Sequence, residues 1–255
     1  MKISILGSAG WMPSDNRQTT SIMVRNESTL LLFDAGTGVA NLQAYEDILE
    51  RYDELHVFLS HYHLDHTMGI CFLPRWFRDR KITFHVPART LGGMNGEEVL
   101  GLLHNTESFP ISLSKLAAEV KVKLYEGNTA FMAGDLRLET KAQTHSNPSF
   151  AVKINDLVCF ATDTIVDKST FSWANDVRVL FHECWSDEKD GSGHSSYQEI
   201  LAAREWLKQS ANEGGTVPKI YLIHQNPMIS WSEYCEFVAE SPDVVLARDM
   251  MDVTV

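Results

Sequence analysis

The sequence lacks closely spaced cysteines, long apolar runs and a signal-peptide-like beginning. Its four cysteines lie far apart and form no CxxC pair, which is typical of reduced, mostly buried thiols. No stretch approaches the roughly 18 apolar residues of a membrane span. Only four apolar residues precede Gly7, too few for the apolar region of a signal peptide. These absences predict a cytoplasmic protein with no membrane partner.

Basic residues are also scarce: 22 Lys and Arg stand against 34 Asp and Glu, a formal net charge of −12. This balance argues against a surface built to neutralise the phosphates of a nucleic acid, although a local basic patch would not alter the total much. The chain has 255 residues with no repeat, charge block or Ser/Pro/Gly-rich linker. We therefore expect one domain spanning residues 1–255.

Runs of β-branched and apolar residues dominate the first third of the chain and later alternate with stretches of helical periodicity. Segments 38–52 and 195–210 have the helical pattern, and either Ser195 or Ser196 is placed to cap the second. This order predicts an α/β fold, a four-layer αβ/βα sandwich of two sheets with helices on their outer faces. The predicted strands are 2–8, 19–26, 29–36, 55–60, 81–86, 120–126, 150–154, 157–162, 177–183 and 219–224.

The segment "LSHYHLDH", residues 59–66, places three histidines and an aspartate directly after an apolar strand. His61 and His63 are alternate residues, so in extended backbone they point to the same side and can hold one ion. Asp65 and His66 follow where the chain is expected to turn into a helix, so they would face a second ion. Imidazoles and carboxylates are common ligands of zinc-like metals. The pattern HxHxDH therefore predicts half of a two-metal site.

Three further polar residues each follow a β-rich run: His145, Asp163 and His224. At the carboxyl ends of strands, these residues would reach the same edge of a sheet as the HxHxDH segment. A residue of this kind, taken alone, is more often a turn or capping residue than a ligand. Together with the first four ligands they complete the usual set for two ions about 3.5–4 Å apart.

HxHxDH followed by a distant His, an Asp and a final His resembles the metallo-β-lactamase superfamily, and the resemblance covers nearly the whole chain. It implies an αββα sandwich and a hydroxide nucleophile shared by two metals. Asp34, in "LLFDAG", resembles the aspartate that supports the site, although a turn carboxylate explains it equally well. The implied ligands are His61, His63 and His145 for one metal, Asp65, His66 and His224 for the other, and Asp163 as the bridge.

The segment "LFHECWSDEKDGSGHSS" is similar to the phosphodiesterase branch of that superfamily, which contains tRNase Z. The similarity implies that His194 assists the leaving oxygen and that Glu183 orients and charges it. A carboxylate-backed imidazole can protonate an alkoxide near neutral pH. The alternative is that His194 is only a loop residue. Arg17 matches the N-terminal loop of the branch and is a candidate surface or substrate contact, and His104 is a weaker one.

The similarity to tRNase Z stops between His145 and Asp163, where that enzyme carries a long arm for tRNA. Here the interval has room for little more than a hairpin around Asn155 and Asp156, and Ala151 replaces a glycine of the family. We therefore predict a phosphodiesterase acting on a small cyclic phosphate or nucleotide. A tRNA 3′-processing endoribonuclease and a carbon-ester, lactone or thioester hydrolase remain the alternatives.

Two further alternatives are a non-catalytic binding protein and a diiron oxidoreductase. The predicted cofactors are two divalent metal ions, with Zn²⁺ first and Mn²⁺ or Fe²⁺ also compatible with the ligands. In the proposed hydrolysis Asp65 and Asp163 orient the nucleophile. The resemblance also predicts a homodimer. The remaining histidines, His56, His85 and His182, and the aromatics Trp76 and Phe77 are expected to pack in the fold rather than to act in the site.

Overall fold

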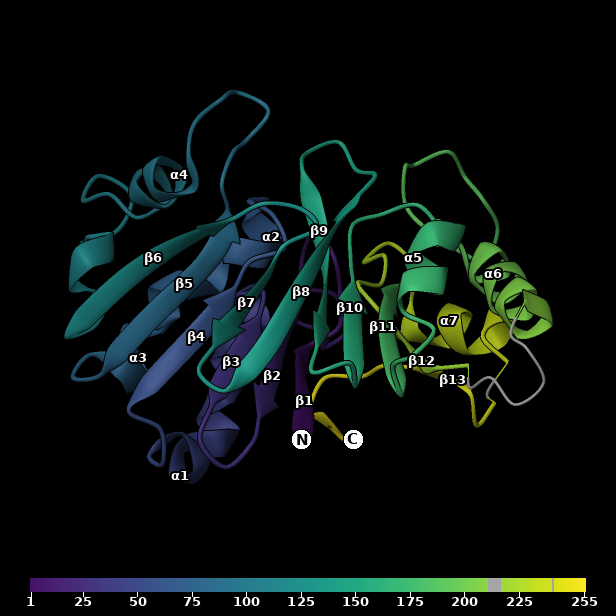
Figure 1. Cartoon of the computed structure of the whole chain (residues 1–255), viewed down its shortest axis with the longest axis horizontal. Helices are drawn as coiled ribbons and strands as arrows, with labels where there is room; N and C mark the ends of the chain where they lie inside the picture. Colours follow the sequence, from purple (N-terminus) through teal and green to yellow (C-terminus); the bar gives the residue numbers. More distant parts are fainter. Residues whose placement is uncertain (211–216, 240) are drawn as a thin grey trace.

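Two β-sheets packed face to face, with helices on their outer sides, form the molecule (Figure 1). A computed structural model describes residues 1–210, 217–239 and 241–255. The first sheet, in spatial order, contains β14 (Met251–Thr254), β1 (Lys2–Gly7), β2 (Ser21–Arg25), β3 (Leu30–Phe33), β4 (Glu54–Phe58), β5 (Lys81–Pro87) and β6 (Glu119–Tyr125). The second contains β13 (Val244–Leu246), β12 (Lys219–Ile223), β11 (Val179–Glu183), β10 (Val158–Ala161), β9 (Ser149–Ile154), β8 (Leu136–Gln143) and β7 (Ala130–Ala133). The predicted α/β sandwich is confirmed.

The helices are short and follow the strands along the chain. The α-helices are α1 (Glu46–Leu49), α2 (Leu64–Thr67), α3 (Pro74–Phe77), α4 (Gly96–Leu103), α5 (Lys168–Trp173), α6 (Tyr197–Ser210) and α7 (Trp231–Phe237). The 3₁₀-helices are η1 (Thr37–Tyr45), η2 (Met68–Phe72) and η3 (Leu113–Lys115). The helix predicted at 38–52 is therefore mostly 3₁₀. Its Gly38 packs directly on the backbone of Gly7, a close approach that leaves no room for a Cβ.

Alternation along the strands divides the core between the sheets from the core under the helices. Phe33 of β3 and Phe160 of β10 stack across the two sheets with ring centroids 4.7 Å apart. Phe58 stacks on Phe33, and Phe181 on Phe160, so four aromatic rings form a continuous column. This apolar centre fixes the two sheets against each other and thereby sets the strand ends that carry the site.

Local signals in the sequence set several boundaries. Ser196 caps α6, because its hydroxyl accepts a hydrogen bond from the N–H of Glu199 while the Glu199 carboxylate accepts one from the Ser196 N–H. Asn155 and Asp156 have φ values of 51° and 53°, the left-handed pair of a tight hairpin turn between β9 and β10. That hairpin confirms that the interval before Asp163 holds no arm.

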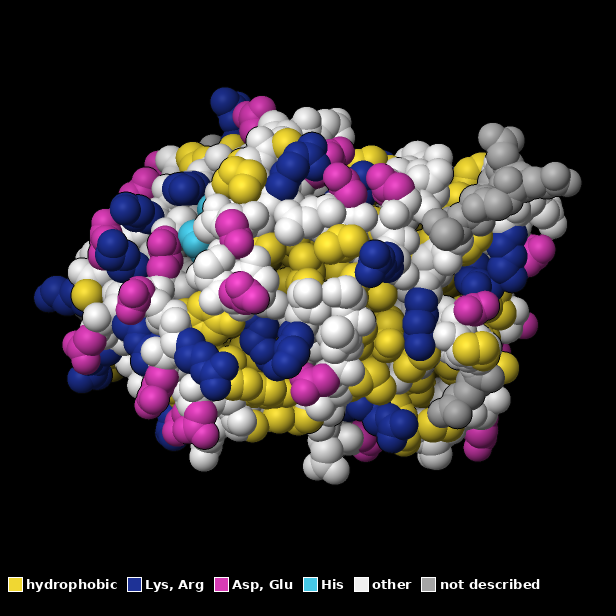
Figure 2. Space-filling view, turned by 60° about the horizontal axis from the view of Figure 1, so that its bottom comes forward, with side chains coloured by type: hydrophobic (Ala, Val, Ile, Leu, Met, Phe, Trp, Pro, Cys, Tyr) yellow, Lys and Arg dark blue, Asp and Glu magenta, His cyan; other side chains and the backbone are white. Residues whose placement is uncertain are grey.

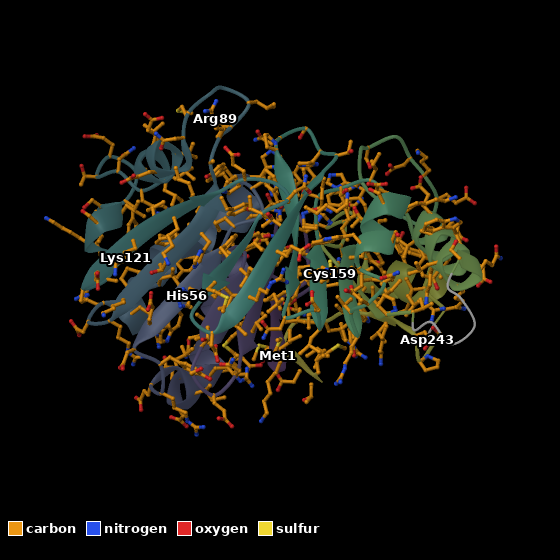
Figure 3. The ribbon with its side chains drawn as sticks, in the orientation of Figure 1. Met1, His56, Arg89, Lys121, Cys159 and Asp243 are labelled. Atoms are coloured by element: carbon orange, nitrogen blue, oxygen red, sulfur yellow. The ribbon has the colours of Figure 1, made fainter. Side chains whose placement is uncertain are left out.

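The cysteines are only partly as expected. All four are free; Cys159 in β10 (Figure 3) and Cys184 are buried, whereas Cys71 is half-buried and Cys235 is exposed. Within the described part of the chain, no helix combines the length and the hydropathy needed to cross a bilayer.

Candidate metal centre

The polar residues predicted at the ends of strands meet at one edge of the two sheets. His61 and His63 follow β4, His145 follows β8, Asp163 follows β10 and His224 follows β12. Asp65 and His66 lie in the first turn of α2, which continues the segment after β4. The carboxyl ends of parallel strands face the same edge of a sheet. This arrangement brings His61 and His224, the first and last of these residues along the chain, into a single cluster.

The seven predicted ligands divide into two sets, and within each set the candidate ligand atoms lie within 4.8 Å of one another. One set contains His61, His63, His145 and Asp163; the other contains Asp65, His66 and His224. Asp163 faces both: its Oδ1 lies 3.4 Å from His145 Nε2, and its Oδ2 lies 2.9 Å from His66 Nε2 and 3.1 Å from His224 Nε2. The structure thus brings together the residues that the sequence predicted for each metal, with Asp163 between the two sets, and their role as ligands stays a prediction.

The chemistry of these donors fits divalent cations. Nε2 of His61 is buried and has no hydrogen-bond partner among the described residues. The ring centroids of His61 and His66 are only 4.3 Å apart, and those of His61 and His63 are 4.4 Å apart. Burial, and then the nearby His66, hold the pKa of His61 well below its usual range, so its nitrogen is available as a neutral ligand. A cation at each set would satisfy these crowded lone pairs.

Left-handed backbone at three site residues turns the chain sharply where strands end. Asp34, Asp163 and His224 have φ values of 55°, 49° and 48°. Non-glycine residues adopt this conformation rarely, and it is retained where surrounding contacts fix it. At His224 one such contact is Gly10: a Cβ at that glycine would overlap the imidazole ring. The motif-based prediction named Asp163 and His224 as ligands and Asp34 as their support, but it did not include the backbone conformation that presents them.

Asp34 supports the centre from below. Its buried carboxylate accepts hydrogen bonds from the Ser60 N–H at 2.7 Å, the Ser60 hydroxyl at 2.8 Å and Nδ1 of His66 at 2.7 Å. The bond from Nδ1 fixes the orientation of the His66 ring and leaves Nε2 for the centre. Burial raises the pKa of Asp34, while His66 and Ser60 oppose that change. The geometry favours the supporting role over a simple turn carboxylate.

A carboxylate–imidazole pair stands beside the two ligand sets. Glu183, buried at the end of β11, accepts a hydrogen bond from Nδ1 of His194 at 2.7 Å. Burial disfavours a charged His194, but the hydrogen bond and negative charge of Glu183 outweigh it and raise the pKa of His194 above its ordinary value. Trp185 stacks on the imidazole with centroids 4.4 Å apart and an interplanar angle of 18°. A ring nitrogen of His194 lies within 4.8 Å of ligand atoms of Asp163 and His224.

A pocket of about 290 Å³ opens over the centre. Sequence reasoning missed Trp11, Ser146 and Trp185 in its wall. Trp11 is 60% exposed, and its backbone N–H donates to Oδ2 of Asp65 at 2.7 Å. The sequence offers one indication that Trp11 lines the pocket: it is a large aromatic residue directly after Gly10, the glycine that packs on His224. The pocket is lined by Trp11, His63, Asp65, His145, Ser146, Asp163, Trp185, His194 and His224.

Two weaker site candidates lie elsewhere. Arg17 is buried, not a surface contact: its guanidinium donates to Gln225 Oε1 at 3.0 Å and to the Ile229 carbonyl at 2.8 Å. These bonds tie the loop after β1 to the loop after β12. His104, at the end of α4, is buried in a separate small cavity next to Leu64 and Phe109. Neither lines the pocket over the centre.

The histidines expected to pack in the fold do so. His56 of β4 (Figure 3) and His85 of β5 face each other, with Nδ1 and Nε2 3.2 Å apart. His182 is buried in β11 on the opposite side from Glu183 and bonds the Glu183 carbonyl at 2.8 Å. Phe77 is buried, and Trp76 is half-buried with its indole N–H on Glu46.

Comparison with known proteins fixes the family. The family described as "anti-Pycsar protein Apyc1" matches residues 1–228. The chain belongs to this family. The fold is that of YhfI from Bacillus subtilis, a metallo-β-lactamase-fold protein whose solved structure has a TM-score of 0.76 at 18% identity, covering 99% of this chain and 98% of that one.

Proteins of similar sequence carry the names of hydrolases. The "probable metallo-hydrolase YhfI" of Bacillus subtilis is 24% identical over 218 residues, 84% of each chain. A ribonuclease Z of Haloarcula marismortui is 34% identical over 122 residues, 46% of this chain. The match spans only 38% of that ribonuclease Z. A diphosphatase of the PhnP family has the same fold, with a TM-score of 0.71 at 14% identity, covering 100% of this chain and 97% of that one.

Proposed function

We propose that this protein is a metal-dependent hydrolase, and specifically a phosphodiesterase acting on a small cyclic phosphate or a nucleotide. The observation that carries the proposal is the Glu183–His194 pair, 2.7 Å apart, beside the two ligand sets. A carboxylate-backed imidazole beside two metal ions can protonate the alkoxide that leaves a phosphodiester, which is a poor leaving group unless protonated.

Seven residues would hold two divalent cations, Zn²⁺ or alternatively Mn²⁺ or Fe²⁺. His61, His63 and His145 would bind one, Asp65, His66 and His224 the other, and Asp163 both. When bound, such cations polarise a phosphoryl oxygen and lower the pKa of water. The two carboxylates give the site negative charge to balance them.

Asp65 and Asp163 would orient the attacking water. Asp65 lies at the surface of the pocket, with its side chain 12% exposed, and its Oδ2 already accepts from Trp11. Asp163 lies deeper, with its side chain 3% exposed. Carboxylates in these positions can accept hydrogen bonds from water and so direct a lone pair toward phosphorus.

His194 would donate a proton to the leaving oxygen. Glu183 accepts a hydrogen bond from Nδ1 of His194, so the protonated ring keeps its second N–H, at Nε2, for the substrate. The Glu183 carboxylate is fixed in turn by the N–H of Thr164. Stacking of Trp185 on His194 restrains the ring plane. These contacts hold the His194 imidazole in one orientation before a substrate binds.

Pocket size and surroundings support a small substrate. About 290 Å³ is at the lower limit of ordinary small-molecule sites, and the exposed indole of Trp11 offers a flat face for stacking at the rim. The short β9–β10 hairpin and the net charge of −12 give little support for a tRNA. The names of the relatives, ribonuclease and diphosphatase, both describe cleavage at phosphorus.

A tRNA 3′-processing activity is the second candidate, because a ribonuclease Z is 34% identical over 122 residues. One panel tests both. The protein reconstituted separately with Zn²⁺ and Mn²⁺ is assayed with bis(p-nitrophenyl) phosphate, 3′,5′-cyclic nucleotides, a precursor tRNA and p-nitrophenyl acetate. We expect chelator-sensitive cleavage of the first two. Cleavage of precursor tRNA with no cyclic nucleotide turnover would favour the second candidate, and cleavage of the carbon ester alone would contradict both. The homodimer stays a prediction.

A further inference from the structure

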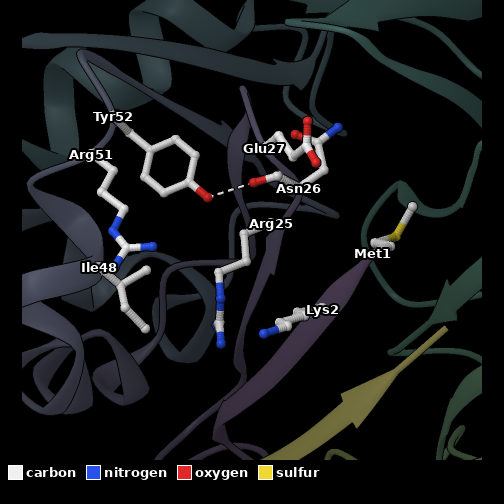
Figure 4. A pocket seen from close by; sticks show the side chains of 8 residues that line it. All are labelled: Met1, Lys2, Arg25, Asn26, Glu27, Ile48, Arg51 and Tyr52. Atoms are coloured by element: carbon white, nitrogen blue, oxygen red, sulfur yellow. Dashed lines mark hydrogen bonds between the residues drawn. The ribbon is translucent and has the colours of Figure 1, made fainter.

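A second cavity, of about 490 Å³ (Figure 4), is lined by residues at the start of β1 and the end of β2, and so lies at the opposite end of the first sheet from the candidate metal centre. The metal ligands follow the carboxyl ends of β4 and β12, whereas this cavity lies between the start of β1, the end of β2 and the segment around α1. It shares no residue with the pocket over the centre. Its lining residues are Met1, Lys2, Arg25, Asn26, Glu27, Ile48, Arg51 and Tyr52.

Arg25 is a largely buried cation in this wall, and its guanidinium lies over the Tyr45 ring, 5.5 Å from the ring centroid. It is 8% exposed, and its one side-chain hydrogen bond in the described part of the chain runs from Nη1 to the Ser4 hydroxyl at 2.7 Å. Ser4 passes the bond on to Asp252, so a carboxylate reaches Arg25 only through that hydroxyl. The other buried arginine, Arg17, donates to three oxygens. A guanidinium has five N–H donors, and none of the Arg25 nitrogens is both buried and without a partner, so the free ones face the cavity and can donate to an anion there.

Two more cations border the same space. Lys2 and Arg25 are directly opposite in the β1–β2 register, and Figure 4 shows their side chains pointing toward one another. Like charges at such a pair repel. Arg51 stands on the opposite wall, and Glu27 is the acidic member of the lining. Among the described residues no carboxylate lies in ion-pair distance of Lys2, Arg25 or Arg51, although other surface cations such as Arg75 and Lys121 have such partners.

The rest of the wall is suited to a small organic molecule. Ile48 and Tyr52 give it an apolar side, and the Tyr52 hydroxyl donates to the Asn26 carbonyl at 2.6 Å, which fixes the rim. Figure 2, in which this end of the molecule comes forward, shows Lys and Arg side chains beside an exposed hydrophobic area. The volume falls within the range of ordinary ligand sites. Three cations in a chain of net charge −12 therefore surround a space of ligand size.

We propose that this cavity binds a phosphate group, either free phosphate or the phosphate of a small monoester. Arg25 and Lys2 contact the anion from one side, and Arg51 faces it from the opposite wall. A planar guanidinium can bind two oxygens of one phosphate, and the added negative charge offsets the repulsion between Lys2 and Arg25. The site is separate from the metal centre and does not depend on the function proposed for that centre.

Calorimetric titration of the metal-loaded protein with inorganic phosphate and, separately, ribose 5-phosphate tests the proposal. Because phosphate also has affinity for metal ions, the deciding comparison is with the Lys2→Gln/Arg51→Gln double variant, in which both changed side chains are exposed. We expect this variant to lose one class of phosphate sites, with affinity reduced about tenfold or more, and to retain phosphodiester turnover. Arg78→Gln removes an exposed arginine outside the cavity and should bind as the original protein does.

Arg25→Gln should give the same loss, and the double variant decides the question if Arg25→Gln does not fold. Phosphate binding that is equal in the original protein and the double variant would overturn the proposal, because all of it would then belong to the metal centre. Acetate at the same ionic strength is the chemical control. Equal occupation of the variant-sensitive site by acetate would overturn the assignment to phosphate. The tighter of the two phosphate probes identifies free phosphate or a monoester as the natural form.

Discussion

Glu183 and His194, 11 positions apart in the chain, are joined by a 2.7 Å hydrogen bond between a buried carboxylate and an imidazole whose side chain is 15% exposed. Glu183 ends a central strand, whereas His194 comes from the loop before α6. The strand gives the pair its fixed member and the loop brings the proton donor to the pocket. The relationship connects the fold to the proposed chemistry, and the first prediction concerns it directly.

Removing the charge of Glu183 should change the pH dependence of activity. The protonated form of His194 is the proposed donor, so kcat/KM falls as pH rises through its pKa, which Glu183 holds above the ordinary value of 6.5. Glu183→Gln should lower that pKa and move the alkaline limb of the profile to lower pH. Glu188→Gln, an exposed neighbour in the same loop, is the control. An unmoved alkaline limb in Glu183→Gln would show that another group titrates there.

Loss of the residue between the two ligand sets should remove metal. Asp163 approaches His145, His66 and His224, so Asp163→Ala should leave less than the two metal ions per chain expected for the original protein. Elemental analysis after gel filtration measures the content. Asp156→Ala, at the exposed β9–β10 turn, should keep both metals. Full metal content in Asp163→Ala would contradict the bridging role.

Asp34 should affect metal affinity without touching metal. Asp34→Asn retains the shape of the side chain but weakens its bond to Nδ1 of His66. The expected loss of affinity is about 10–100-fold, measured by competition with a chromogenic chelator. Asp135 directly precedes β8, and its carboxylate accepts hydrogen bonds from Thr29 and Asn26. The variant Asp135→Asn therefore controls for the change of charge. Equal affinity in both variants would reduce Asp34 to a turn residue.

Trp11 should matter for substrates that carry a base. Its indole is 60% exposed at the rim of the pocket, and stacking on a base contributes about 1–3 kcal/mol. Trp11→Ala should therefore raise KM for a cyclic nucleotide about fivefold or more, and leave KM for a ribose cyclic phosphate without a base unchanged. Trp206→Ala, a change on α6 away from the pocket, is the matched control. A parallel rise for both substrates would point to a general effect on the loop.

The sequence predicted the layers of the fold because apolar alternation and turn residues are local signals. The Asn155–Asp156 turn and the Ser196 cap lie where propensity alone puts them. Strand β14 was missed, since its pairing with β1 joins residues about 250 positions apart and no local pattern encodes that. The segment predicted as one helix at 38–52 divides into the 3₁₀-helix η1 and the α-helix α1, and the apolar spacing of its residues did not distinguish the two types.

For the site, motif spacing was enough to name the candidate ligands but not to describe the residues around them. HxHxDH and three strand-end residues gave the two sets that the structure brings together. Arg17 was misplaced because a charged residue in a loop is usually exposed, whereas here Gln225 and the Ile229 carbonyl satisfy it inside the molecule. Trp11 and Trp185 were missed because an aromatic residue gives no sign in the sequence of whether it faces a core or a pocket.

The most direct test of the proposed mechanism is the turnover of a cyclic nucleotide by His194→Ala, with metal content measured on the same sample. The mechanism predicts that kcat falls about 10²–10⁴-fold while both metals remain bound, because His194 donates a proton and is not required as a ligand. Turnover at the original rate by a variant with both metals would contradict it, and would make His194 a loop residue beside a centre that works without it.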